Sequence, residues 1–179
     1  MNSKHEELLQ PATGCHNQQG QTVSTNIKHE ELLRQVCEET FMAMAFLSPV
    51  DRDECPATDL DSLPVSVEFT GQFNGRLTLK VSRQIPAILA ANVLGLDDGD
   101  APSPDQQADA LKETLNVICG NILPLVSDAT QVFNVHAPQM LDAGPATPAQ
   151  ARPDASVLLY TDSGSAEVLL WLDDAIAAT

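Results

Sequence analysis

The chain has 179 residues, of which 43% are hydrophobic and only 4% are aromatic. This length fits one domain, or one domain with a tail, whose core must be filled mainly by aliphatic side chains and methionine. Its 25 acidic and 9 basic residues give a net charge of −16. Such a surface repels phosphate backbones and anionic lipids. Nucleic acids and membranes are therefore poor candidates for partners.

The sequence shows no sign of membrane insertion, export or metal binding. No apolar run approaches the roughly 18 residues that cross a membrane, and residues 1–14 lack the apolar centre of a signal peptide. The four cysteines are widely spaced, at Cys15, Cys37, Cys55 and Cys119, which argues against a zinc site or a redox pair. We therefore expect a cytoplasmic protein with reduced thiols, no metal site and no cofactor of its own.

The N-terminal part of the chain divides into a tail and a helix. Residues 1–25 are rich in Gln, Asn, Thr and Gly without sustained periodicity, which predicts a flexible N-terminal tail before a single domain at 26–179. A helix is predicted from Asn26, as its N-cap, to Leu47. Residues 48–62 are acidic and contain two prolines, so they are expected to form a connecting loop.

The next segment predicts a hairpin followed by a short helix. Residues 65–70 and 76–81 both alternate apolar and polar side chains with a period of two, as strands do. The Gly- and Asn-containing residues 71–75 supply the turn between them. Residues 83–94 are then expected to form a helix that ends at Gly95 as its C-cap.

A longer helix is predicted over 105–126. Ser103 or Asp105 is placed to cap its first turn, and the intervening proline suits that position. After this helix, residues 131–136 are typical of a strand, which is expected to stop at Pro138.

The C-terminal part predicts a loop and a second hairpin. Residues 142–155 contain three prolines and one glycine, which is typical of a loop. Residues 157–161 and 167–172 read as two strands joined by a turn at 162–165. Hairpins imply antiparallel pairing, so the fold class is α+β, with long helices packed on a mainly antiparallel sheet. The two halves are loosely alike, which hints at an intertwined pseudo-repeat.

One face of the helix at 105–126 gathers polar residues and a glycine. At about 100° per residue, Asp109, Glu113, Asn116 and Gly120 fall within an arc of about 60°. The opposite side carries Leu111, Leu115, Ile118 and Ile122. Acids and Asn on a solvated helix are ordinary, but Gly inside a helix costs about 1 kcal/mol relative to Ala. Gly120 therefore suggests that another molecule approaches this face closely.

These spacings resemble a known signature. Asp109-x3-Glu113-x2-Asn116, followed by Pro138 after 21 intervening residues, is similar to the motif of the CheC/CheX/FliY chemotaxis phosphatases. The hairpin at 69–79 also resembles CheX-like sequences, and the resemblance covers roughly residues 27–172. It implies a CheC/CheX-like α+β fold with an intertwined pseudo-repeat.

The resemblance also implies a function. Members of this family dephosphorylate the response regulator CheY, whose receiver domain carries a phosphorylated aspartate beside a lysine and a bound Mg²⁺. By this resemblance, Asn116 would orient the attacking water and Glu113 would pair with the receiver's lysine. Asp109, Gly120 and Pro138 would have supporting roles. The Mg²⁺ would belong to the receiver.

The chain also departs from the family pattern. The equivalent first helix, at Glu38–Met42, lacks the Asn of a second motif, so one site per chain is expected, as in CheX. CheX-type proteins form homodimers; the residues leave the oligomeric state open, although the two hairpins supply edge strands that could pair. A non-catalytic module that binds a receiver or another chemotaxis partner is the alternative function. The intact Glu113 and Asn116 favour catalysis.

Other chemical motifs are weaker. His5 and His29 each precede Glu, but the second histidine of a metalloprotease motif is missing. Cys119 lies toward the apolar side of its helix, so a buried thiol is expected rather than a nucleophile.

Overall fold

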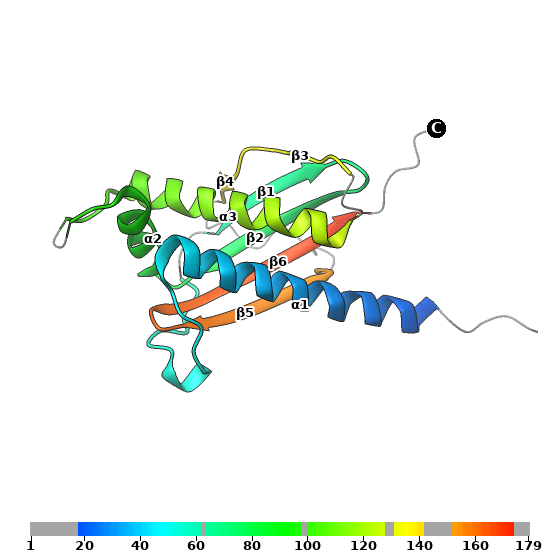
Figure 1. Cartoon of the computed structure of the whole chain (residues 1–179), viewed down its shortest axis with the longest axis horizontal. Helices are drawn as coiled ribbons and strands as arrows, with labels where there is room; N and C mark the ends of the chain where they lie inside the picture. Colours follow the sequence, from blue (N-terminus) through cyan, green and yellow to red (C-terminus); the bar gives the residue numbers. More distant parts are fainter. Residues whose placement is uncertain (1–17, 62–63, 98–99, 128–130, 142–151, 174–179) are drawn as a thin grey trace, which may run out of the picture.

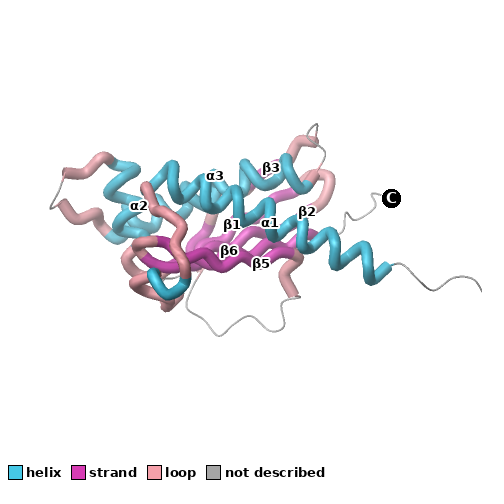
Figure 2. Tube along the Cα trace, turned by 60° about the horizontal axis from the view of Figure 1, so that its bottom comes forward, coloured by secondary structure: helices cyan, strands magenta, loops and turns pink. Residues whose placement is uncertain are grey.

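A computed structural model describes residues 18–61, 64–97, 100–127, 131–141 and 152–173. Within these ranges, three α-helices lie on one face of a six-stranded antiparallel sheet (Figure 1). Figure 2 shows the same arrangement from another side, with the helices in one layer and the strands in a second. The predicted α+β class, with helices packed on an antiparallel sheet, is therefore confirmed.

Helix α1 spans Gln18–Ala45 and is longer than predicted. The predicted N-cap, Asn26, lies inside this helix, so the predicted start is wrong by eight residues. The boundary drawn at residue 25 for the flexible tail likewise falls inside α1, and residues 1–17 lie outside the described residues. Gln is a good helix former, so a helix can extend through polar residues without an apolar stripe. In Figure 1 the first turns of α1 extend beyond the sheet.

Two hairpins form the middle of the sheet. Strands β1 (Val65–Thr70) and β2 (Asn74–Val81) pair antiparallel, and so do β5 (Ala155–Thr161) and β6 (Gly164–Asp173). Both hairpins were predicted, and each of their four strands begins and ends within a few residues of its predicted bounds. They join where β2 pairs with β6, from Asn74 opposite Asp173 to Val81 opposite Ala166.

The two halves of the chain are intertwined. Helix α1, from the first half, packs on β5 of the second hairpin, whereas α3 (Pro104–Val126), from the second half, packs on β1 of the first. Each half also adds a short segment to the other hairpin. Pro49 forms a bridge with Thr161 of β5, and β3 (Asn134–Val135) pairs with β1. Neither half can therefore complete its layers alone.

The strand predicted at residues 131–136 is shorter than expected. The strand there is limited to β3, followed by a hydrogen bond of 2.9 Å from the His136 N–H to the Glu68 carbonyl. A second short strand, β4 (Gln139–Met140), comes next and also pairs with β1. Pro138 separates the two strands, because a proline has no N–H to donate to the ladder. Of the predicted loop at 142–155, residues 142–151 lie outside the described residues. Its last residue, Ala155, is the first residue of β5.

Helix α2 (Ile85–Leu94) connects the first hairpin to α3 and contacts both other helices. It ends as predicted at Gly95, whose φ of 62° is the left-handed conformation that glycine adopts without steric cost. Between α1 and β1, the described residues of the expected loop include a short 3₁₀ turn, η1 (Arg52–Glu54), after the bridge at Pro49. The core lies between the three helices and the sheet, and its largest buried side chains include Phe41, Phe69, Leu89, Leu115 and Ile118.

Candidate functional site

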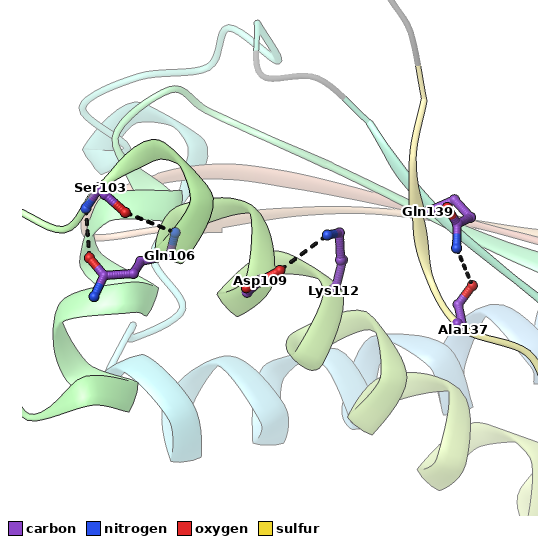
Figure 3. Close-up of polar contacts among 6 residues, drawn as sticks. All are labelled: Ser103, Gln106, Asp109, Lys112, Ala137 and Gln139. Carbon is purple, nitrogen blue, oxygen red and sulfur yellow. Dashed lines mark hydrogen bonds and ion pairs between the residues drawn. The ribbon is translucent and has the colours of Figure 1, made fainter.

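Helix α3 starts at a well-defined cap. The Ser103 hydroxyl accepts a hydrogen bond from the Gln106 N–H at 3.3 Å, and the Ser103 N–H donates to Gln106 Oε1 at 2.8 Å (Figure 3). This reciprocal pair is a capping box, which satisfies two N–H groups that a helix start leaves unpaired. Of the two caps that the sequence allowed, Ser103 is therefore the one used, and the register of the helix is fixed from its first turn.

One side of α3 is buried in the core. Its buried residues are Ala110, Leu111, Thr114, Leu115, Ile118, Cys119, Ile122 and Leu123. The one polar oxygen among these side chains is satisfied within the helix, because Thr114 Oγ1 donates to the Ala110 carbonyl at 2.8 Å. This wide apolar face packs against α1, α2 and β1. It makes α3 a rigid support for whatever its other face carries.

The opposite face of α3 presents the four predicted residues together. Asp109, Glu113, Asn116 and Gly120 are all exposed, as the helical spacing predicts. Glu113 and Asn116 are neighbours at i,i+3. Within the part of the chain that the structure describes, neither side chain has a hydrogen bond or an ion pair. A carboxylate and a carboxamide thus stand side by side with their polar atoms available to another molecule.

Asp109 does have a partner, which the sequence analysis missed. Its Oδ1 lies 3.1 Å from Nζ of Lys112, an ion pair at i,i+3 (Figure 3). Lys112 is the only basic residue of α3, and it lies one turn before Asn116 on the same side of the helix. The sequence contains a signal for this ion pair, because opposite charges three residues apart on a helix are neighbours.

The space around Gly120 does not require a glycine at this position. Among the described residues, a Cβ atom built at this position would have nothing within 4 Å apart from the helix's own backbone. Pro124 lies four residues later within the helix. Since proline has no N–H, the Gly120 carbonyl lacks its usual helical donor. The surface beside Asn116 is therefore flat and includes a backbone acceptor.

Pro138 is not on α3 but on a neighbouring segment. It lies half-buried between β3 and β4, and both strands contact α3. Figure 3 shows the adjoining Ala137 and Gln139 on the side of α3 that carries Lys112. The Gln139 Nε2 donates to the Ala137 carbonyl at 3.2 Å and closes this short connection. Pro138 thus belongs to a segment next to α3, whereas the other four residues are on the helix itself.

The remaining candidates offer no competing chemistry. Cys119 is fully buried, and burial raises the pKa of its thiol to about 12, so it stays protonated near neutral pH. Among the described residues, no group of three His, Cys, Asp or Glu side chains could hold a metal ion. The described helices also include none that is long and apolar enough to cross a membrane.

Comparison with known families gives one match. A family model described as chemotaxis phosphatase CheX matches residues 64–174, which is more than half of the chain. This range contains α3, both hairpins and all five predicted site residues. No curated protein sequence matches the chain.

Several solved structures share the fold. A chemotaxis protein CheX from Desulfovibrio desulfuricans has a TM-score of 0.61 at 19% identity, over 81% of this chain and 99% of that chain. A CheX from Vibrio vulnificus has a TM-score of 0.59 at 13% identity, over 83% and 98%. A CheX–CheY–BeF₃–Mg²⁺ complex from Borrelia burgdorferi has a TM-score of 0.55 at 15% identity, over 82% and 99%. At these identities the similarity concerns the fold alone.

Proposed function

Because the chain belongs to the CheX family of chemotaxis phosphatases, we propose that it hydrolyses the aspartyl phosphate of a CheY-like receiver domain. The observation that carries this proposal is the pair of unpartnered polar side chains, Glu113 and Asn116, on the exposed face of α3. The choice of partner is supported by the crystal structure of a CheX of the same fold, from Borrelia burgdorferi, in complex with CheY. The cytoplasm is the proposed location.

Asn116 is suited to positioning the attacking water. An aspartyl phosphate is already activated, so the enzyme needs no strong nucleophile; it must hold one water in line with the phosphorus–oxygen bond. A carboxamide can both accept from and donate to that water, and it brings no negative charge toward the anionic phosphoryl group. Since α3 is fixed by its cap and its buried face, the Asn116 side chain starts from a rigid base.

Glu113 is suited to docking. It projects beside Asn116 and has no partner within the described residues, so its carboxylate can pair with the lysine of the receiver. A charge-assisted contact in a closing interface is stronger than one in open water. The enzyme needs no metal of its own in this scheme, because the Mg²⁺ would be held by the receiver.

Helix α1 provides a comparison within the same chain. Its Glu39 is exposed like Glu113, but it accepts a hydrogen bond from Gln35 Nε2 at 2.9 Å. The residue three positions after Glu39 is Met42, which cannot orient a water. We therefore propose one site per chain, on α3.

The test follows phosphate loss from a phosphorylated CheY-like receiver in the presence of Mg²⁺. The wild type should accelerate the loss, and Asn116→Ala should slow the catalysed rate by about 100-fold, as removal of a single transition-state contact does. Glu113→Ala should mainly raise KM. Glu39→Ala, on α1, is the matched control and should behave as the wild type.

Two outcomes would contradict the proposal. If the wild type never exceeds the receiver's own rate of decay, the phosphatase function is wrong; binding without acceleration would then support the adapter module instead. If Asn116→Ala is as fast as the wild type, the activity is real but the site is elsewhere.

A homodimer is also proposed, and the structure limits how it would form. Strands β1, β2 and β6 are each paired on both sides, so β5 is the edge of the two hairpins. Part of that edge is already covered, because the Val50 N–H donates to the Tyr160 carbonyl at 3.0 Å and Arg34 donates to the Leu158 carbonyl at 3.3 Å. Light scattering of the full chain would give the oligomeric state.

A further inference from the structure

The face of the sheet that points away from the helices carries an ordered group of side chains. On β1, β2 and β6, Glu68 lies opposite Arg76, and Arg76 lies opposite Trp171. Two residues further along the same strands come Thr70, Asn74 and Asp173, of which Asn74 and Asp173 are directly opposite. Because side chains alternate between the faces of a strand, these six residues share the outer face. We call them the outer-face cluster.

The outer-face cluster lines a cavity of about 420 Å³, together with Phe69 and Gly75. This volume lies within the range of small-molecule sites in proteins, toward its lower end. The cavity lies on the opposite face of the sheet from α3. Its walls belong to three paired strands, which hold side chains more precisely than loops do.

Arg76 is the member of the cluster with a buried polar atom that lacks a partner among the described residues. Its guanidinium carbon lies 4.5 Å from the centre of the Trp171 ring, a cation–π contact. Its Nε is buried and has no hydrogen-bond partner among the described residues. Among the described residues, no carboxylate lies within ion-pair distance of Arg76, even though Glu68 is directly opposite on the next strand. The half-buried Arg76 and the exposed Glu68 are thus opposite each other without an ion pair between them.

We propose that this cavity binds a small zwitterion of the α-amino acid type with a cationic side chain. The carboxylate of such a molecule would pair with Arg76, and its α-ammonium with Glu68, so that it fills the gap between the two. The cluster contains two acids and one base, a net charge of −1. The second cation of the ligand would then pair with Asp173, two strand spacings (about 10 Å) from β1. Thr70 and Asn74 supply further hydrogen-bonding groups.

The charges of the cluster disfavour simpler ligands. An inorganic anion would approach Arg76 but would meet the carboxylates of Glu68 and Asp173. A simple cation would leave Arg76 unpaired and would add a like charge beside it. Only a molecule with both signs satisfies all three charged residues. Pairing matters most at Arg76, because Glu68 and Asp173 are exposed to water whereas Arg76 is half-buried.

The chain contains a single tryptophan, and it lines this cavity. Intrinsic fluorescence therefore reports on the proposed site directly. Titration of the full chain with L-lysine should give a saturable change. Nα-acetyl-lysine, which lacks the α-ammonium, lysinamide, which lacks the carboxylate, and L-glutamate, which lacks the second cation, should each bind about tenfold more weakly or worse.

The variants separate the site from general effects on the fold. By calorimetry, Arg76→Met and Glu68→Gln should each weaken L-lysine binding by about tenfold, and Arg76→Lys should restore part of it. Lys80→Met, on the same face of β2 but outside the cavity, is the matched control and should bind as the wild type does. Urea denaturation of each variant shows whether it is folded.

Two results would overturn the proposal. One is the absence of saturable binding of L-lysine to the wild type up to about 10 mM, a concentration that corresponds to negligible affinity. The other is equal binding of all four probes, or equal binding by Arg76→Met and Lys80→Met. None of these measurements involves a receiver, so they stand apart from the phosphatase assay.

Discussion

Asp109 and Lys112 form an ion pair on the exposed side of α3, with 3.1 Å between Oδ1 and Nζ. The Lys112 side chain is 34% exposed, whereas that of Asp109 is 76% exposed. The lysine therefore lies closer to the body of the protein, one turn before Asn116. A surface pair of this kind contributes little to stability, about 0–1 kcal/mol. Its main effect is to fix one positive charge beside the proposed site in a chain of net charge −16.

This pair leads to a prediction about association with the receiver. An aspartyl phosphate is anionic, so Lys112 should attract it and Asp109 should repel it. At low ionic strength, Lys112→Gln should lower kcat/KM by about threefold, and Asp109→Asn should raise it by a similar factor, while kcat changes little. Both effects should shrink at high ionic strength, because salt screens exposed charges. The measurement is kcat/KM for receiver dephosphorylation at several salt concentrations.

Lys80→Gln removes the same charge on the far face of the sheet and is the control for net charge. An effect of Lys112→Gln that persists at high salt would contradict a purely electrostatic role. So would an equal effect of Lys80→Gln.

The Asn116→Ala variant should separate activity from stability. Asn116 is exposed and has no partner within the described residues, and Ala is the better helix former. The free energy of unfolding should therefore rise by about 0.5 kcal/mol while dephosphorylation is largely lost. Urea denaturation gives the first quantity and the receiver assay the second. A destabilised variant would indicate that Asn116 has a structural contact, and lost activity would then say nothing about water positioning.

The periodicity of the sequence was sufficient to place the site helix and both hairpins. The arc of Asp109, Glu113 and Asn116 followed from 3.6 residues per turn alone, because the apolar residues of α3 lie on one continuous side. Alternation with a period of two likewise identified β1, β2, β5 and β6. These signals are local, so a single sequence contains them.

The features that the sequence did not reveal depend on contacts between distant segments. Nothing near residue 139 indicates that β4 pairs with β1, since a strand of two residues has no period of its own. The start of α1 at Gln18 was missed because its first turns are mostly polar, with Val23 as the one aliphatic residue before Ile27. The outer-face cluster unites β1 with β6, which are about 100 residues apart, and only the sheet order brings them together.

Gly120 gives a prediction in which stability and activity move in opposite directions. A Cβ atom fits there without any clash, and Ala is favoured over Gly inside a helix by about 1 kcal/mol. Gly120→Ala should therefore stabilise the fold by about 1 kcal/mol. If the receiver packs against this face, the added methyl group should also raise KM severalfold. Urea denaturation and the receiver assay measure the two effects.

Asn121→Ala is the neighbouring control for Gly120→Ala. Asn121 is also exposed, but it lies about 100° around the helix from Gly120. This variant should be slightly stabilised without a change in KM. An unchanged KM in Gly120→Ala would show that the receiver does not approach this part of α3 closely.

Cys119 provides a test of which side of α3 carries the catalytic residues. Burial raises the pKa of its thiol from 9.0 to about 12, so the thiol ionises more easily in the unfolded chain. Its contribution to stability is therefore complete below about pH 9 and is lost as the pH rises toward 12. Cys119→Ala should lower the free energy of unfolding near neutral pH by about 1 kcal/mol through the lost packing. It should also make the decline of stability at alkaline pH shallower.

Receiver dephosphorylation by Cys119→Ala near neutral pH should be unchanged, because the thiol points into the core. A folded Cys119→Ala variant without activity would contradict the proposed site and would indicate that the buried side of the helix, rather than the Glu113–Asn116 face, takes part in catalysis.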